Sequence, residues 1–213
     1  MFWGLLCQIF PASSIIPLYF FAHAHQITPT KYYEPNFFSI PLGYAKTLIP
    51  TLVISFLIPT PLLLGREKSY NQSLAVWLPY PIFASLVHHI LRSLVPTPTK
   101  AREDADLPYL RGAYLLSFLA SALAHMSTLG PDGHLASQEY PHAGSAAVWF
   151  GNLVVSAAGL VWLIVLFGDV KRFRKTNAGW LAIIPAIALG TVAVGPAATI
   201  MAAYALREEA LRA

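Results

Sequence analysis

Three histidines and two carboxylates share one short segment of this sequence, residues 124–142, which has no lysine or arginine. They are His125, Asp132, His134, Glu139 and His142. Imidazole and carboxyl groups are the common general acids and bases, so this segment could supply or relay a proton. Their spacing matches no standard zinc signature, and we expect no metal site here. Asp132 has a second interpretation, because the stretch GPDG is also typical of a tight turn.

A second set of such groups lies elsewhere in the chain. His88 and His89 lie within an apolar run, and Asp106 lies in the stretch REDADLPY at 102–109. Asp106 could act as an acid, or it could stabilise the start of a helix that has Pro108 in its first turn. The two sets lie on opposite sides of the topology deduced below, so only one of them can donate the catalytic proton.

The composition of the chain predicts the elements that must position these residues. Of its 213 residues, 56% are hydrophobic and only 11% are charged, against about a quarter charged in soluble domains. Several apolar runs approach the roughly 20 residues that a membrane-spanning helix needs. These runs lie at about 1–22, 44–64, 74–95, 113–129, 146–168 and 180–206. We therefore predict an all-α integral membrane bundle of six transmembrane helices, forming a single domain over 1–213, or of seven if the last run splits at Gly195-Pro196.

The basic residues favour one orientation of this bundle. The loops after the first, third and fifth runs hold most of them, with DVKRFRK at 169–175 the strongest block. Because cytoplasmic loops carry an excess of Lys and Arg, these loops are predicted to be cytoplasmic and both termini lumenal. A seven-helix arrangement would move the C-terminus alone to the cytoplasmic side.

Several function classes are disfavoured by what the sequence lacks. With Cys7 as the single cysteine, an intramolecular disulfide and a multi-cysteine zinc site are excluded. The sequence has no nucleophile elbow, no glycine-rich phosphate loop and no paired acids for magnesium and a diphosphate. No Asp or Glu lies in the middle of an apolar run, which disfavours an ion-driven transporter. We also find no nucleic-acid signature and expect no cofactor.

Three stretches of the C-terminal half resemble a known family. They are Asp106 followed by YLRGAYLLSFLASALAH, then VWFGNLVVSAAGLVW, and finally GPAATIMAAYALREEAL. In these stretches, and in size and helix number, the chain is similar to the fungal membrane-bound terpene cyclases of meroterpenoid pathways, such as that of ascofuranone. It departs from that family at Gly151-Asn152, where a Trp-Asp pair is frequent. An amide cannot serve as a Brønsted acid, so the proton donor would have to be another residue.

The resemblance implies a cofactor-independent cyclase of the endoplasmic reticulum that binds a lipophilic substrate from the bilayer. The reaction would be acid-initiated epoxide opening or polyene cyclisation, with aromatic rings stabilising the cation. The candidate acids and bases are His125, Glu139, Asp106 and Asp132. The candidate substrate-binding residues are Asn152, Trp149, Tyr114, Trp77, His88 and His89. Two alternatives stay open, a membrane epoxide hydrolase and a non-catalytic small transporter or assembly factor, and the oligomeric state is left open too.

Overall fold

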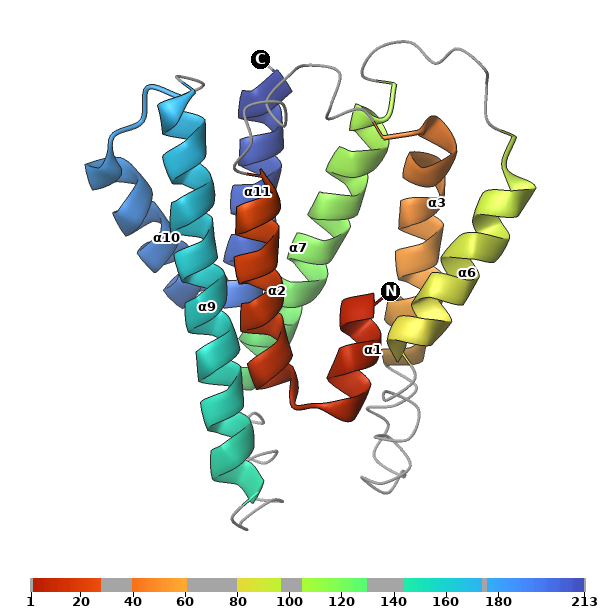
Figure 1. Ribbon diagram of the computed structural model, residues 1–213, viewed down its shortest axis with the longest axis horizontal. Coiled ribbons are helices and arrows are strands. Elements are labelled where there is room, and N and C mark those ends of the chain that lie inside the picture. Colours follow the sequence, from red (N-terminus) through yellow and green to blue (C-terminus); the bar gives the residue numbers. More distant parts are fainter. Residues whose placement is uncertain are drawn as a thin grey trace. The chain divides into compact units, whose positions relative to one another are not determined.

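The computed structural model describes residues 2–27, 40–60, 80–96, 105–129, 144–173 and 176–212, and every regular element in these ranges is a helix (Figure 1). The helices are α1 (Phe2–Ile9), α2 (Ala12–Ile27), α3 (Leu42–Leu52), the π-helix η3 (Val53–Leu57), α6 (Tyr80–Leu94), α7 (Leu107–Leu129), α9 (Gly144–Arg172), α10 (Trp180–Val194) and α11 (Pro196–Arg212). The prediction of an all-α fold is thus confirmed for this part of the chain.

Two of the helical segments are long and apolar enough to cross a membrane, judged by length and composition alone. They are Leu107–Ser127 and Phe150–Arg172. Shorter apolar helices cover Leu42–Leu57, Ile82–Leu94 and Trp180–Val194. The described residues therefore support two candidate spans, and the count of six or seven stays a prediction.

Proline and glycine divide two of the predicted runs. The first run is broken at Phe10 and Pro11, between α1 and α2, because proline lacks the N–H that would continue the helix. The last run is broken at Gly195, whose φ of 90° is a conformation that glycine adopts without steric cost. The division of the last run occurs at the position that the seven-helix alternative named.

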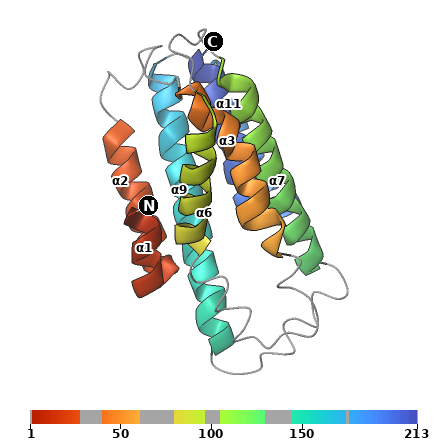
Figure 2. The same ribbon diagram turned by 90° about the vertical axis from the view of Figure 1, so that its right-hand side faces the viewer.

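The chain forms two compact units, and the first comprises Met1–Pro11 and Ser39–Ala113. In this unit α3 and α6 lie side by side, as both ribbon views show (Figures 1 and 2). Asp106 is buried just before α7, and its Oδ2 accepts a hydrogen bond from the backbone N–H of Ile40 at 3.0 Å. This hydrogen bond therefore joins the segment that leads into α3 to the start of α7.

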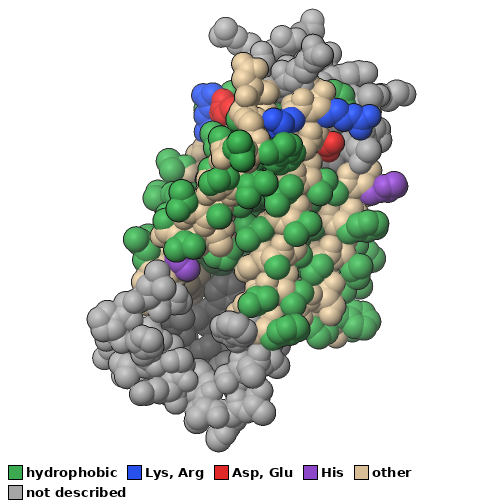
Figure 3. Space-filling view, turned by 90° about the vertical axis from the view of Figure 1, so that its left-hand side faces the viewer, with side chains coloured by type: hydrophobic (Ala, Val, Ile, Leu, Met, Phe, Trp, Pro, Cys, Tyr) green, Lys and Arg blue, Asp and Glu red, His purple; other side chains and the backbone are tan. Residues whose placement is uncertain are grey.

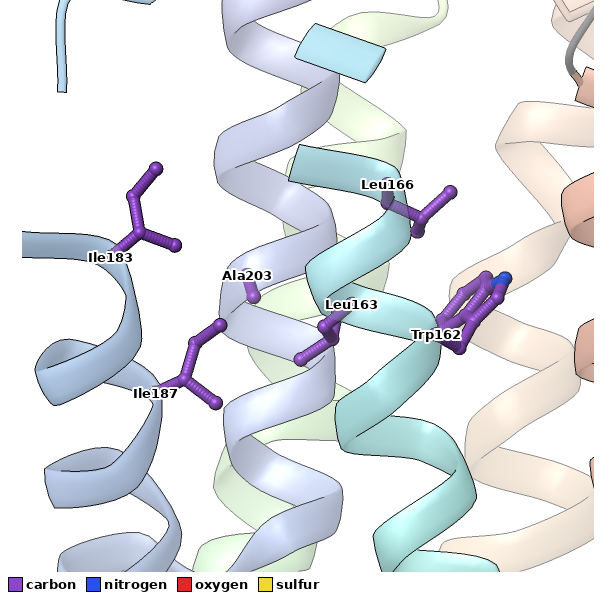
Figure 4. Packing of buried hydrophobic residues seen from close by; sticks show 6 residues of the cluster. All are labelled: Trp162, Leu163, Leu166, Ile183, Ile187 and Ala203. Atoms are coloured by element: carbon purple, nitrogen blue, oxygen red, sulfur yellow. The ribbon is translucent and has the colours of Figure 1, made fainter. Parts of the chain in front are cut away.

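The second unit comprises Ala12–Phe38 and Tyr114–Ala213, and α9 lies at its centre. Helix α9 packs against both α2 and α11, and α11 in turn packs against α10. Its buried core joins three helices through Trp162, Leu163, Leu166, Ile183, Ile187 and Ala203 (Figure 4). A Cβ at Gly159 would lie 2.5 Å from Ile200 Cδ1, so this glycine lets α9 and α11 approach closely.

The ends of α9 and α11 meet at one end of this second unit. Val170 and Leu211 are both buried and form a small cluster of their own. A six-helix arrangement would place Leu211 on the side of the membrane opposite to Val170. Within this unit the chain thus turns back at Gly195-Pro196, as in the seven-helix alternative, and the number of membrane crossings stays a prediction.

Charged and apolar side chains are segregated on the face that carries α9 and α10. Figure 3 shows hydrophobic side chains over most of the described surface, with Lys, Arg, Asp and Glu gathered at one end. Large apolar residues stay exposed on α10, including Leu181 at 94% and Val192 at 76%. Contiguous apolar surface of this kind is typical of a face that contacts lipid or another protein.

Candidate active site

A line of aromatic rings crosses the second unit, with contributions from α2, α7, α9 and α11. The ring of Phe20 stacks on that of Trp162 with centroids 4.8 Å apart, and Tyr204 stacks on Trp162 at 5.6 Å. Tyr114 lies against Tyr204 at 5.8 Å. We call Phe20, Tyr114, Trp162 and Tyr204, together with His23, the aromatic site.

His23 reaches the aromatic site because of its spacing from Phe20. Residues three apart on a helix lie on the same face, so both side chains of α2 point toward α9. The imidazole of His23 meets the indole of Trp162 edge to face, with centroids 5.3 Å apart and planes at 72°. The side chain of Trp162 points away from Ile183 and Ile187 of the same core (Figure 4). Its ring contacts α2 instead, through Phe20.

Two polar atoms of the aromatic site are buried without a hydrogen-bond partner among the described residues. They are Nε1 of Trp162 and Nδ1 of His23. Trp162 as a whole is only 7% exposed. Buried polar groups are nearly always hydrogen-bonded in folded proteins, so two such atoms on neighbouring rings form an unusual local feature.

Charged side chains flank the aromatic site on α11. The guanidinium of Arg207, which is fully buried, lies 5.4 Å from the centre of the Tyr204 ring. Glu208 lies between two arginines, with 3.8 Å from its Oε1 to Nη1 of Arg207 and 3.7 Å from its Oε2 to Nε of Arg212. The carboxylate therefore offsets the positive charge next to the rings, and this end of the site is ionic rather than apolar.

Of the residues predicted for the site, Tyr114 lies in it, whereas His125 does not. His125 follows Tyr114 by eleven positions on α7, a rise of roughly 16 Å along the helix. Its ring lies instead against Gly195, at the turn between α10 and α11. Asn152 is exposed on α9, roughly 15 Å along the helix from Trp162.

His88 belongs to a polar cluster in the first unit. Its Nδ1 lies 3.2 Å from the hydroxyl of Thr51 and 3.5 Å from that of Thr47. The same hydroxyls lie near backbone carbonyls, at 2.6 Å for Thr51 and 3.0 Å for Thr47. Which atom of each Thr–His88 contact donates depends on the tautomer of the imidazole. The adjacent His89 is exposed on the same helix.

Asp106 accepts a hydrogen bond from the backbone N–H of Ile40, which precedes α3, and its role as an acid or at the start of α7 stays a prediction. Glu139, Asp132 and Trp77 lie outside the described residues, as does the side chain of Trp149. Their proposed roles stay predictions.

His23 and Phe20 were not among the residues singled out from the sequence. They lie in the stretch YFFAH at 19–23, at the end of the first apolar run. The available signal was the spacing of an aromatic and a histidine by three residues on one helix face. That spacing becomes informative only when Trp162 of α9 is known to lie opposite Phe20 and His23.

The family model of the CtvD domain matches residues 1–149, which is more than half of the chain. The chain belongs to the CtvD domain family. The matched residues include Phe20, His23 and Tyr114 of the aromatic site and end before Trp162.

Curated fungal proteins are similar to this CtvD-domain chain over nearly its whole length. A terpene cyclase of Pyrenophora dematioidea is 25% identical over 99% of this chain and 65% of its own length. The FAD-dependent monooxygenases atnA of Arthrinium sp and anuJ of Penicillium roqueforti are 25% and 24% identical, over 94% and 99% of this chain. The chain spans 28% of the length of each of these two monooxygenases. No solved structure matches the chain.

Proposed function

We propose that this protein is a membrane-embedded cyclase of fungal natural-product biosynthesis. It would open an epoxide, or protonate a polyene, in a lipophilic terpenoid substrate and guide the resulting cation to a ring. The reaction is an isomerisation: the proton added at the start is returned when the final cation loses one, so it requires no redox cofactor. Membership of the CtvD domain family and similarity to a fungal terpene cyclase support this class of protein.

The observation that carries the proposal is the line of aromatic rings in the second unit. Terpene cyclisation passes through carbocations, and the face of an aromatic ring stabilises a cation by about 0.5–2 kcal/mol. Phe20, Tyr114, Trp162 and Tyr204 supply four rings from four helices, and the other buried residues of the cluster around Trp162 are aliphatic. On that side of the site, away from Arg207 and Glu208, the aliphatic side chains exclude water, which would otherwise capture the cation.

The related monooxygenases suggest how the substrate is made. Their names describe flavin-dependent monooxygenation, and in both a region similar to this chain is part of a much longer protein. A monooxygenase can convert a terminal alkene to an epoxide by adding one oxygen atom of dioxygen. An epoxide-opening cyclase would be a natural consumer of that product, and we propose this order of reactions for the chain.

A substrate of this kind partitions into the bilayer, and the proposal therefore includes a multi-pass protein of the endoplasmic reticulum. The two long apolar segments and the exposed apolar side chains of α10 support membrane embedding. The proton donor predicted from the sequence stays a proposal for His125, Glu139 and Asp132. Asp106 is the weakest of these candidates, since its carboxylate already accepts a backbone N–H.

The test is an assay on microsomes from a host that expresses the full chain. Farnesylated aromatic epoxides and polyene epoxides would be supplied, and the products separated by chromatography and identified by mass spectrometry. We expect a product of unchanged mass and new retention time. A gain of one water would instead identify an epoxide hydrolase, and no conversion of any epoxide would contradict both enzymatic functions.

Variants of the aromatic site make the test specific. Phe20→Leu removes a ring that stacks on Trp162, and we expect cyclised product to form roughly twofold to thirtyfold more slowly, the factor equivalent to one aromatic–cation contact. Phe83→Leu is the matched control, because Phe83 is 42% exposed and lies in the other unit. Equal rates for the two variants at equal abundance would argue against a role of the rings in catalysis.

A further inference from the structure

Two polar atoms in the aromatic site are buried without a hydrogen-bond partner among the described residues, and the packing of the rings does not explain why. Leaving one hydrogen-bonding group buried and unpaired costs on the order of 1–3 kcal/mol. Trp162 Nε1 and His23 Nδ1 are both in this condition among the described residues, on rings 5.3 Å apart. The remainder of the cluster is well packed, with Phe20 and Tyr204 stacked on the indole.

The chemistry of the two atoms defines what could satisfy them. An indole N–H is a donor only, so its partner must be a hydrogen-bond acceptor. An imidazole Nδ1 can donate as well, depending on the tautomer. An oxygen with two lone pairs and no proton, as in an epoxide, ether or ketone, can accept from both groups at once. The charge of Arg207 is already opposed by Glu208, so the site as a whole does not call for an anionic ligand.

We propose that Trp162 and His23 bind one uncharged oxygen atom of the lipophilic substrate, and that this atom is the epoxide oxygen. This inference rests on the proposed function for the identity of the substrate, but the binding itself does not depend on turnover. Two hydrogen bonds to the oxygen would draw electron density from the C–O bond that must break. They would also hold the reacting end of the chain beside the rings that stabilise the cation.

The position of Trp162 suits this role. Its N–H lies in the plane and at the edge of the indole, so an oxygen can bind there while Phe20 and Tyr204 keep their places on the ring. His23 approaches at 72° to the indole plane, so its own edge is directed differently from that of Trp162. Two donors that approach from different directions match the two lone pairs of an ether-type oxygen.

The experiment measures the indole N–H directly in the full chain, purified in lipid nanodiscs with ¹⁵N-labelled tryptophan. The chain has five tryptophans, and the signal of Trp162 is assigned as the one lost in Trp162→Phe. The probes are the terminal epoxide of farnesylbenzene and farnesylbenzene itself, which keeps the alkene and has no oxygen atom. We expect the epoxide to move the Trp162 N–H proton signal downfield, as a new hydrogen bond does, and the alkene to leave it in place.

Affinities of the same two probes separate hydrogen bonding from packing. Trp162→Phe keeps an aromatic ring but removes the N–H, and we expect it to weaken epoxide binding roughly threefold to tenfold, the value of one hydrogen bond. Binding of the alkene should change less than twofold. His23→Phe should behave likewise, whereas Trp180→Phe, on α10 and 38% exposed, should alter neither.

The inference is overturned if both probes bind the wild-type protein equally, or if Trp162→Phe weakens both to the same extent. Conversion to cyclised product is followed in parallel, so that the two proposals fail separately. Product without the shifted N–H signal would refute the oxygen site alone. A shifted signal without product would refute the cyclase function and leave the oxygen site standing.

Discussion

Gly195 shows how one residue can satisfy two constraints at the same time. Its φ of 90° allows the chain to turn from α10 into α11, and the space at its Cβ position is filled by the ring of His125, with Cγ only 2.6 Å away. His125 thus contributes to the packing of this turn, whatever part it plays in chemistry.

We expect Gly195→Ala to destabilise the protein by roughly 1–3 kcal/mol, since alanine is strained at positive φ and would also displace His125. The measurement is the midpoint of thermal unfolding in detergent. Gly179→Ala is the control, because that glycine has φ −76° and no atom within 4 Å of its Cβ position. Similar midpoints for the two variants would contradict the packing described here.

At the scale of the element, α3 and η3 present a buried row of hydroxyl groups to α6. Thr47, Thr51 and Ser55 are four residues apart and therefore on one face, and each is buried. The first two hydroxyls lie within hydrogen-bond distance of His88 Nδ1. Among the described residues the hydroxyl of Ser55, within the π-helix, has no hydrogen-bond partner.

This difference predicts opposite effects of removing two similar hydroxyls. Thr51→Val breaks a hydrogen bond to Thr47 O and the contact with His88, and should lower the free energy of unfolding by about 1 kcal/mol. Ser55→Ala removes an unpaired polar group and should leave stability unchanged or raise it. Unfolding by denaturant, with Thr51→Ser as a control that keeps the hydroxyl, distinguishes the two. A larger loss for Ser55→Ala than for Thr51→Val would show that Ser55 has a partner.

At the scale of the whole molecule, the second unit separates apolar from charged surface. Basic residues from α9 and α11 lie at the same end, because Val170 and Leu211 pack together there. From the positive-inside rule we predict that both helix ends lie on the cytoplasmic side of a membrane. Because the basic residues of both helices lie at one end, the two ends of the unit differ more in charge than they would in the six-helix arrangement.

We therefore expect a glycosylation acceptor, carried on a long linker after Ala213, to remain unmodified in cells. The same acceptor inserted after Gly133 should be modified, because the start of α9 lies at the opposite end of that helix. Both acceptors would be tested in the variant Asn71→Gln, which lacks the natural glycosylation sequon NQS at 71–73. Modification is read as a shift in gel mobility that a glycosidase reverses, and a modified C-terminal acceptor would restore the six-helix topology.

The sequence by itself determined the helical class, the apolar segments and the family, because these depend on composition, on runs of about 20 residues and on local motifs. It also predicted the break at Gly195-Pro196 as an alternative, since glycine and proline act locally. The stretches that resemble a known family contain Tyr114, Trp162 and Tyr204.

Only the tertiary structure decided which side chains meet. Trp162 comes together with Phe20 and His23 across two helices that are more than a hundred residues apart in sequence, and nothing local in either helix encodes that pairing. The same holds for Val170 and Leu211, whose contact fixed the direction of α11. Periodicity shows that a residue can face a neighbouring helix, but the identity of that neighbour follows from packing of the whole unit.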